Sequence, residues 1–194
     1  MINRSEKVIV SEIGEGIGEI LPHLKIKQYP DILDVGCFGR GGANGSQAII
    51  DSFYNKSNIT AMSYENKIPS KIFKEGKIKH IEGDYFSQKI SNTYDLIYFD
   101  LGWEGQLKMI ETELKTLMYE RLNNNGYLIF YTFNCNAYVH ASEIQHHLDN
   151  FWGVNTLTPP SIVKTINNLN PLYKIKCINK ETVRSQITWI TLQK

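Results

Sequence analysis

This chain of 194 residues has few cysteines, almost no net charge and no long apolar run. The three cysteines, Cys37, Cys135 and Cys177, form no CxxC pair, which excludes a disulfide framework and a cysteine-rich zinc site and indicates free thiols in a reducing compartment. Lys and Arg number 21 against 20 for Asp and Glu, giving a net charge of +1. That balance argues against a general electrostatic attraction to nucleic acid.

No uninterrupted apolar run approaches the roughly 20 residues that a membrane-spanning helix needs. The N-terminus also lacks the basic stretch and apolar segment of a secretory signal. We therefore expect a cytoplasmic protein with no membrane partner, present as a monomer or a homodimer. The chain is long enough to form one sizeable hydrophobic core but too short to form two domains of typical size.

What the chain does contain is an alternation of short apolar strands and helices that begins at Asp31. Strands are predicted at 31–35, 58–64, 78–82, 94–99 and 127–133, with helices from about Ser46 and over 106–122, and a turn at 123–126. This alternation is typical of a parallel sheet covered by helices on both faces.

The two ends of the chain depart from that alternation. Strands are predicted at 172–178 and 187–192, and the eight residues between them allow an antiparallel hairpin but not a parallel crossover. Apolar residues between Ser5 and Leu21 recur at roughly helical spacing, although Gly14, Gly16 and Gly18 weaken that helix. The predicted fold is a single α/β domain, a doubly wound and mostly parallel seven-stranded sheet with one strand reversed by the C-terminal hairpin.

Ligands of open α/β sheets bind beyond the carboxyl ends of the strands. The first predicted strand ends in a glycine cluster, and the next three strands end at Glu65, Asp84 and Asp100. The glycine spacing differs from the GxGxxG turn of dinucleotide-binding proteins, which argues against a nicotinamide-dependent dehydrogenase. Any single acidic residue here could be a helix N-cap, but as a set these residues predict one shared cleft.

Four segments in this order resemble motifs of the class I S-adenosylmethionine-dependent methyltransferases. They are ILDVGCFGRGG at 32–42, IEGDYF at 81–86, YDLIYFD at 94–100 and LNNNGYLIFYT at 122–132. The resemblance covers about Asp31 to Phe133, and the reversed last strand suits that fold. Together with the predicted elements, it divides the chain into an N-terminal helical segment at 1–29, a cofactor-binding core at 30–134 and a region at 135–194. That last region contains a helix, a segment at 151–169 that could form a substrate lid or simply cover the sheet edge, and the hairpin.

The resemblance also implies roles for individual residues toward S-adenosylmethionine and its product S-adenosylhomocysteine. Asp34 would support the loop and the amino group of the cofactor, and Glu65 would hold the ribose hydroxyls, unless Ser63 occupies that position. Asp84 would meet the adenine amine. The remaining cofactor-binding residues are predicted to be Gly36, Cys37, Phe38 and Gly39 beside the methionine part, Tyr85 beside the adenine ring, and Asp100 near the sulfonium.

For the reaction itself, Asp100 and His147 are the predicted catalytic residues. Methyl transfer needs an aligned nucleophile and sometimes a general base, and Asp100 stands at a strand end. His140, Glu143 and His147 would share one helix face, which is either a metal or base cluster or a solvated surface. The segment YFDLGWEGQ resembles a stretch of small-molecule and sugar O-methyltransferases in which a histidine helps bind a metal. Trp103 stands in its place, so no metal is predicted.

The sequence thus predicts a transferase that moves a methyl group to an oxygen or nitrogen of a small-molecule or sugar-like acceptor. Two alternatives stay open. One is a cofactor-binding fold that has lost catalysis and serves as an interaction module. The other is an RNA ribose methyltransferase, a group that needs a lysine and a glutamate where this chain has Tyr131 and Ile187.

Overall fold

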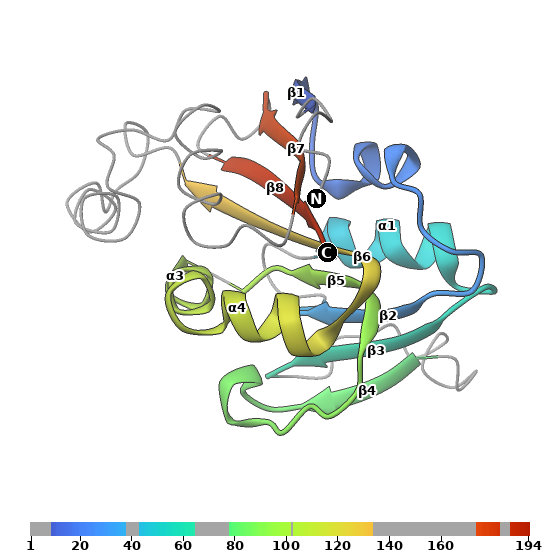
Figure 1. The fold of residues 1–194 in the computed structure, drawn as a ribbon, viewed down its shortest axis with the longest axis vertical. Helices are drawn as coiled ribbons and strands as arrows, with labels where there is room; N and C mark the ends of the chain where they lie inside the picture. Colours follow the sequence, from blue (N-terminus) through green and yellow to red (C-terminus); the bar gives the residue numbers. More distant parts are fainter. Residues whose placement is uncertain (1–8, 38–42, 65–77, 102, 134–173, 183–186) are drawn as a thin grey trace, which may run out of the picture.

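The computed structural model describes residues 9–37, 43–64, 78–101, 103–133, 174–182 and 187–194. Its eight strands form one sheet in the order β1-β7-β8-β6-β5-β2-β3-β4 (Figure 1). The strands are β1 (Ile9–Ile13), β2 (Asp31–Val35), β3 (Asn58–Ser63), β4 (Ile78–Glu82), β5 (Tyr94–Phe99), β6 (Leu122–Phe133), β7 (Lys174–Glu181) and β8 (Ile187–Gln193). Neighbours pair in parallel, except that β8 runs antiparallel to both β6 and β7.

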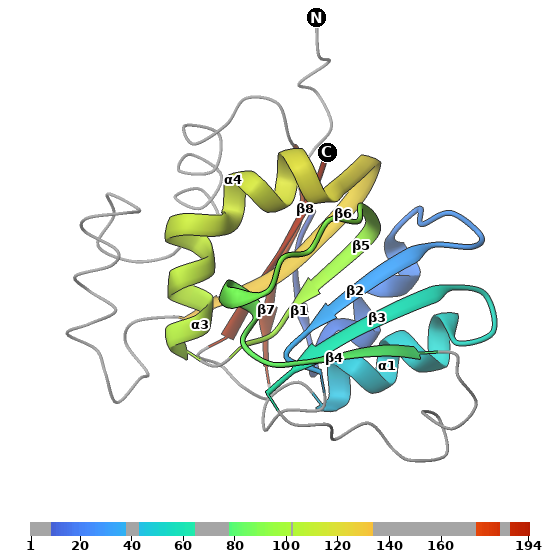
Figure 2. The same cartoon turned by 90° about the horizontal axis from the view of Figure 1, so that it is seen from below.

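Helices cover both faces of this sheet (Figure 2). One face carries α1 (Ala43–Phe53) and two short 3₁₀ turns, η1 (Ile17–Glu19) and η2 (Leu21–His23). The other face carries one continuous helical stretch, α-helical in α3 (Trp103–Lys108) and α4 (Leu114–Thr116), with wider π turns at η4 (Met109–Glu113) and η5 (Leu117–Arg121). A further 3₁₀ turn, η3 (Tyr85–Ser87), follows β4. The mostly parallel α/β architecture and the reversed strand of the C-terminal hairpin are confirmed.

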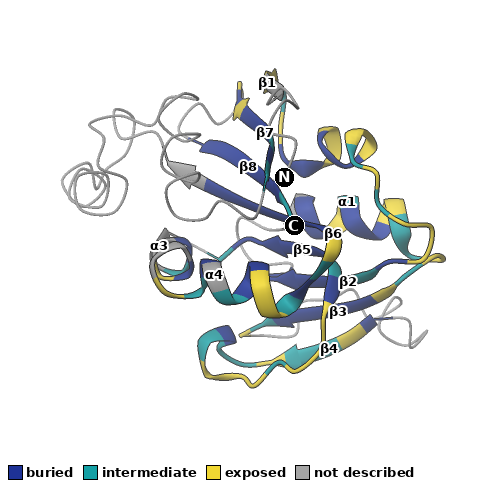
Figure 3. Cartoon of the chain, in the orientation of Figure 1, coloured by how far each residue is buried: buried dark blue, intermediate teal, exposed yellow. Residues whose placement is uncertain are grey.

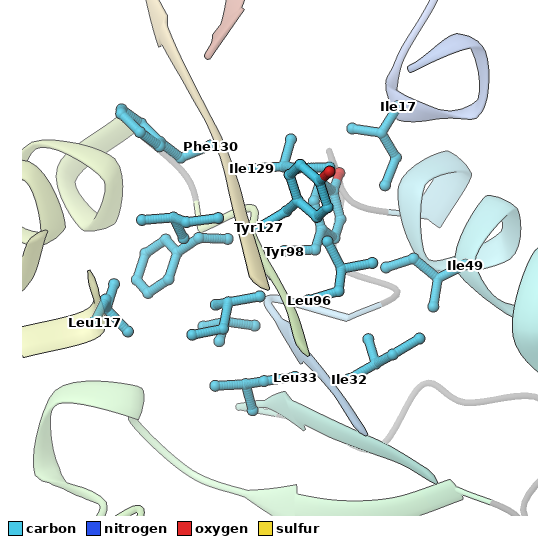
Figure 4. Packing of buried hydrophobic residues seen from close by; sticks show 14 of the residues in the cluster. Ile17, Ile32, Leu33, Ile49, Leu96, Tyr98, Leu117, Tyr127, Ile129 and Phe130 are labelled. Carbon is cyan, nitrogen blue, oxygen red and sulfur yellow. The ribbon is translucent and has the colours of Figure 1, made fainter. Parts of the chain in front are cut away.

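The alternation of side chains along the strands explains why two helical layers are needed. In β2 all of the residues from Ile32 to Val35 are buried, because successive side chains point to opposite, equally covered faces. Figure 4 shows Ile32 on the side of Ile49 from α1 and Ile17 from η1, and Leu33 on the other side with Leu117. Burial therefore extends across the sheet interior, while exposed positions lie in the turns, on the outer helix surfaces and on the outermost strands β1 and β4 (Figure 3).

The sheet has one strand more than the seven predicted, and the extra strand comes from the segment predicted as helical. Ile9–Ile13 forms β1 and pairs in parallel with β7, from Ile9 opposite Cys177 to Ile13 opposite Glu181. The predicted helix over 5–21 was wrong because glycines interrupt it and β7 offers an open edge to a segment rich in β-branched residues. Only the 3₁₀ turns η1 and η2 remain helical within the described part of 1–29.

The turn predicted at 123–126 also proves to lie within a strand. Tyr94 of β5 pairs with Leu122 of β6, whereas Leu96 pairs with Tyr127, so the Asn-Asn-Asn-Gly segment bulges out of a strand that continues through it. Asn125 adopts a φ of 64°, the left-handed conformation that asparagine tolerates. The segment 123–126 has residues typical of a turn, but the residues before and after it both pair with β5, so the segment stays within β6.

Candidate functional site

The carboxyl ends of β2, β3, β4 and β5 lie at one edge of the sheet, because these four strands are parallel neighbours. Asp34, Asp84 and Asp100 all lie at or just beyond these ends. The strand order turns around at β2, since the chain runs from β2 to β3 and β4 on one side and then crosses to β5 on the other. A switch point of this kind is where α/β sheets bind ligands.

Asp34 is the most buried acidic residue of this edge, with 2% of its surface exposed. It hydrogen-bonds to Ser46 of α1, whereas its Oδ1 has no hydrogen-bond partner among the described residues. Burial raises the pKa of Asp34 to about 7, an effect reduced by the Ser46 hydrogen bond and increased by the charge of Asp100. The edge therefore contains a carboxyl group that ionises near neutral pH and keeps one acceptor atom unused.

Gly36 brings the turn after β2 directly against the end of β5. Its φ of 89° lies in the left-handed region, which glycine adopts without steric cost. A Cβ at this position would overlap the backbone carbonyl of Asp100, so only a hydrogen fits there. Asp100 also donates its backbone N–H to the carbonyl of Val35 at 2.8 Å. The structure thus places the predicted Gly36 and Asp100 side by side.

The Asp100 carboxylate is buried and ordered by Tyr98, which was not among the predicted site residues. Tyr98 donates its hydroxyl to Asp100 Oδ2 at 2.7 Å. The same hydroxyl lies against the backbone of Gly45, where a Cβ would overlap it, so Tyr98 connects β5 to the first turn of α1. The signal was available in the sequence, because Tyr98 and Asp100 are two residues apart and lie on the same side of the chain.

Asp84 and Tyr85 follow β4 but have different environments. Asp84 is half-buried and caps η3, its Oδ1 accepting the N–H of Phe86 at 3.2 Å. Tyr85 is buried, with its ring packed edge-on against Phe99 at a centroid distance of 5.0 Å. Tyr64, which was not predicted, is an aromatic residue at this edge with 66% of its surface exposed. Its pKa is raised by desolvation and by the charge of Asp84, to which it also hydrogen-bonds.

Cys37 lies in the turn that follows β2, and Ser63 is the last residue of β3. Ser63 Oγ lies 2.9 Å from His80 Nε2 and also hydrogen-bonds to the Cys37 thiol. Burial, together with the charge of Asp34, raises the pKa of Cys37 to about 12, so the thiol stays protonated at neutral pH. Cys37 is therefore positioned as a structural neighbour of Asp34 and not as a nucleophile.

Four of the predicted site residues lie outside the described residues: Phe38, Gly39, Glu65 and His147. The proposed lid at 151–169 and the His140 and Glu143 positions also lie outside them. Within the described ranges, His, Cys, Asp and Glu side chains form no group of three or more that could hold a metal ion. In the same part of the chain, no helix is long and apolar enough to cross a membrane.

A separate hollow of about 650 Å³ opens at the opposite edge of the sheet. It is bordered by the starts of β2, β3 and β5, including Asp31, Asn58 and Tyr94, and by Lys79 and the loop 91–93. Its position at the amino ends of the strands separates it from Asp34 and Asp100. The two regions are therefore distinct parts of the molecule.

No protein-family model matches the sequence, and no curated protein matches it. Solved structures do resemble the fold. A putative rRNA methylase from Clostridium thermocellum superposes with a TM-score of 0.60 at 11% identity, covering 94% of this chain and 97% of its own. The plantazolicin methyltransferase BpumL, in complex with a desmethyl-plantazolicin analogue and SAH, gives 0.52 at 15% identity, covering 85% and 76%.

The pyocyanin biosynthetic protein PhzM gives a TM-score of 0.53 at 14% identity. The match covers 92% of this chain but only 54% of PhzM, so this chain spans about half the length of that protein. At these identities the likeness concerns the fold. The strand order, the reversed β8 and these structural neighbours together show that the chain has the class I S-adenosylmethionine-dependent methyltransferase fold.

Proposed function

We propose that this protein transfers a methyl group from S-adenosylmethionine to an oxygen or nitrogen of a small-molecule or sugar-like acceptor. The observation that carries the proposal is Asp34. It is a buried carboxyl group at the switch point of this fold, and its Oδ1 has no hydrogen-bond partner in the described chain. A buried acceptor without a donor is costly unless a ligand supplies one.

The residues at this edge fit the cofactor. Asp34 would accept a hydrogen bond from its amino group, and the close approach at Gly36 would let the backbone pass along the methionine part. Asp84, with its neighbour Tyr64, would lie toward the nucleoside. Phe38, Gly39, Glu65 and Tyr85 remain predicted neighbours of the cofactor. When bound, the cofactor supplies an electrophilic methyl group on a positively charged sulfur.

Asp100 is proposed to act on the acceptor side. Its buried carboxylate is oriented by Tyr98 and lies next to the Gly36 turn, so it could accept a proton from, or orient, the attacking hydroxyl or amine. His147 remains a second candidate for this role. The near-neutral charge of the chain favours a small acceptor over an RNA backbone, whose binding depends on many cationic contacts.

Titration calorimetry with S-adenosylmethionine and S-adenosylhomocysteine tests the first half of the proposal. We expect saturable binding that weakens at least about tenfold in Asp34→Asn, because a charge-assisted hydrogen bond contributes roughly 1.5–3 kcal/mol. Asp51→Asn is the matched control, since Asp51 is an exposed carboxylate on α1 that bonds to Gln47. Absence of binding by the wild-type protein would refute the proposal.

Transfer of a labelled methyl group to a panel of phenols, sugars, amines and short oligoribonucleotides tests the second half. Turnover on a small acceptor supports the proposed function. Turnover on oligoribonucleotides alone would replace it with an RNA methyltransferase. Tight cofactor binding with no turnover on any acceptor would instead indicate a cofactor-binding module without catalysis.

A further inference from the structure

Glu181 is a fully buried carboxylate, with 0% of its surface exposed, at the end of β7. Its Oε1 accepts two hydrogen bonds, from the backbone N–H of Gly16 at 2.9 Å and from Trp189 Nε1 at 2.5 Å. Burying a carboxylate is unfavourable unless its hydrogen bonds are strong and well placed. The contact therefore joins three segments: the N-terminal region after β1, β7 and β8.

Trp189 connects Glu181 to the candidate site, because it bonds to Glu181 and packs against Tyr98. It is 1% exposed, and its ring lies against two tyrosine rings. The centroid of Tyr98 is 5.8 Å away at an interplanar angle of 31°, and that of Tyr131 is 5.1 Å away at 66°. Close aromatic packing of this kind restricts each ring to one orientation.

The two tyrosine hydroxyls hold consecutive residues at the end of β5. Tyr98 donates to Asp100 Oδ2 at 2.7 Å, and Tyr131 donates to the backbone carbonyl of Leu101 at 2.8 Å. The strand end thus receives two hydrogen bonds from rings that share Trp189 as a neighbour. We define Glu181, Trp189, Tyr98 and Tyr131 as the aromatic support.

We propose that Glu181 is a positioning residue that acts through Trp189 to fix Asp100 and Leu101 at the cofactor-binding edge. This inference rests on the proposed function, because only that function makes this edge a cofactor-binding site. The contacts within the aromatic support are independent of it. The inference also assigns a role to the N-terminal segment. The Gly16 N–H donates to the Glu181 carboxylate, so the segment that precedes the cofactor-binding core helps to order Glu181.

Glu181→Leu removes the shared acceptor and leaves the Trp189 N–H and the Gly16 N–H without it. Glu181→Gln keeps an oxygen acceptor of the same size and should restore the wild-type behaviour. The matched control is Ile190→Ala, a buried position on the same strand as Trp189 whose side chain points to the other face of the sheet. It destabilises the sheet without touching the aromatic support.

Two measurements are made on each folded variant: S-adenosylhomocysteine affinity by calorimetry, and amide hydrogen exchange of peptides covering 100–106. We expect Glu181→Leu to lose about tenfold or more in affinity and to exchange faster at 100–106. Glu181→Gln and Ile190→Ala should stay within about threefold of wild type in affinity, with 100–106 protected. If Glu181→Leu and Ile190→Ala behave alike in both measurements, Glu181 has only a structural role and the inference is wrong.

Trp189→Phe and Tyr131→Phe provide a second route if Glu181→Leu does not fold. Trp189→Phe removes the indole N–H donor, and Tyr131→Phe removes the bond to Leu101, so both should increase exchange at 100–106. Unchanged exchange in both would overturn the inference. If the wild-type protein binds no S-adenosylhomocysteine, the proposed function fails, and the exchange measurements alone decide the role of Glu181.

Discussion

Tyr98 and Asp100 form a hydrogen-bonded pair of buried side chains at the end of β5, with 2.7 Å between Tyr98 Oη and Asp100 Oδ2. Burial and the adjacent Asp100 charge hold the pKa of Tyr98 well above its ordinary value, so the phenol remains the donor throughout the physiological range. The pair is the point where the sheet, the first turn of α1 and the loop after β5 meet.

Removing the Tyr98 hydroxyl should therefore affect both stability and binding. Tyr98→Phe withdraws a donor from a buried carboxylate, and we expect a loss of about 1–3 kcal/mol in the free energy of unfolding. Urea denaturation measures this loss. Tyr127→Phe is the control, because Tyr127 is equally buried on β6 but its hydroxyl accepts from the Lys25 N–H instead. Weaker S-adenosylhomocysteine binding by Tyr127→Phe than by Tyr98→Phe would contradict the assignment.

The pKa of Asp34, raised to about 7 by burial, makes stability depend on pH in a defined direction. Between about pH 4 and 7 this residue is ionised in the unfolded chain but protonated in the folded one. Raising the pH then favours unfolding, by up to about 1.4 kcal/mol per pH unit. We expect the stability of the wild type relative to Asp34→Asn to fall from pH 4.5 to 6.5 and to level off above about pH 7.5.

Urea denaturation of both proteins at each pH gives this difference directly. All other titrating groups are the same in the two proteins, so their contributions cancel in the difference between the two free energies of unfolding. If that difference does not change with pH, Asp34 does not have the raised pKa. Saturating S-adenosylhomocysteine should reduce the slope, since an ammonium group beside Asp34 favours its ionised form.

Gly36 should tolerate no side chain. Gly36→Ala combines a φ of 89° with overlap of the new Cβ on the Asp100 carbonyl. The backbone conformation alone costs about 1–2 kcal/mol for a residue with a Cβ, and the overlap adds to it. Gly18→Ala is the control, because its Cβ would meet the Ala48 Cβ at an ordinary 3.6 Å. Thermal unfolding should separate the two variants, and equal melting temperatures would contradict this account.

Asp95 should show the opposite pH dependence from Asp34. Burial raises its pKa, but hydrogen bonds from Lys27, from the Asp31 N–H and from Asn123 outweigh burial and leave the pKa below its ordinary value. Its contribution is therefore present above the unfolded-state pKa of about 4 and is lost as the pH falls through the folded-state pKa.

Asp95→Asn should cost about 1–3 kcal/mol at pH 6, and its deficit relative to wild type should shrink toward pH 3. Asp51→Asn, an exposed carboxylate on α1, should show no comparable deficit. A deficit for Asp95→Asn that grows on acidification would reverse the sign predicted here.

Much of the sheet could be predicted from the sequence because each inner strand is buried on both faces. The apolar runs at Asp31–Val35 and Tyr94–Phe99 begin and end where the structure has them. The bounds of the outermost strand, Ile78–Glu82, also agree, although only Ile78 in it is buried. The short loop before Ile187 required an antiparallel hairpin, and that hairpin is present. Parallel pairing then places Asp34, Asp84 and Asp100 at one edge, so this grouping followed from chain order and strand direction alone.

Other features depended on contacts between residues far apart in the chain. Whether Ile9–Ile13 became a helix or a strand was decided by the open edge of β7, more than 160 residues away. The same is true of Glu181, whose role is visible only once Gly16 and Trp189 converge on it. The sequence determined the alternating elements and the acidic strand ends, through local periodicity and burial. Tertiary structure decided the eighth strand, the Tyr98–Asp100 pair and the aromatic support, because their hydrogen bonds and ring contacts exist only after the sheet has assembled.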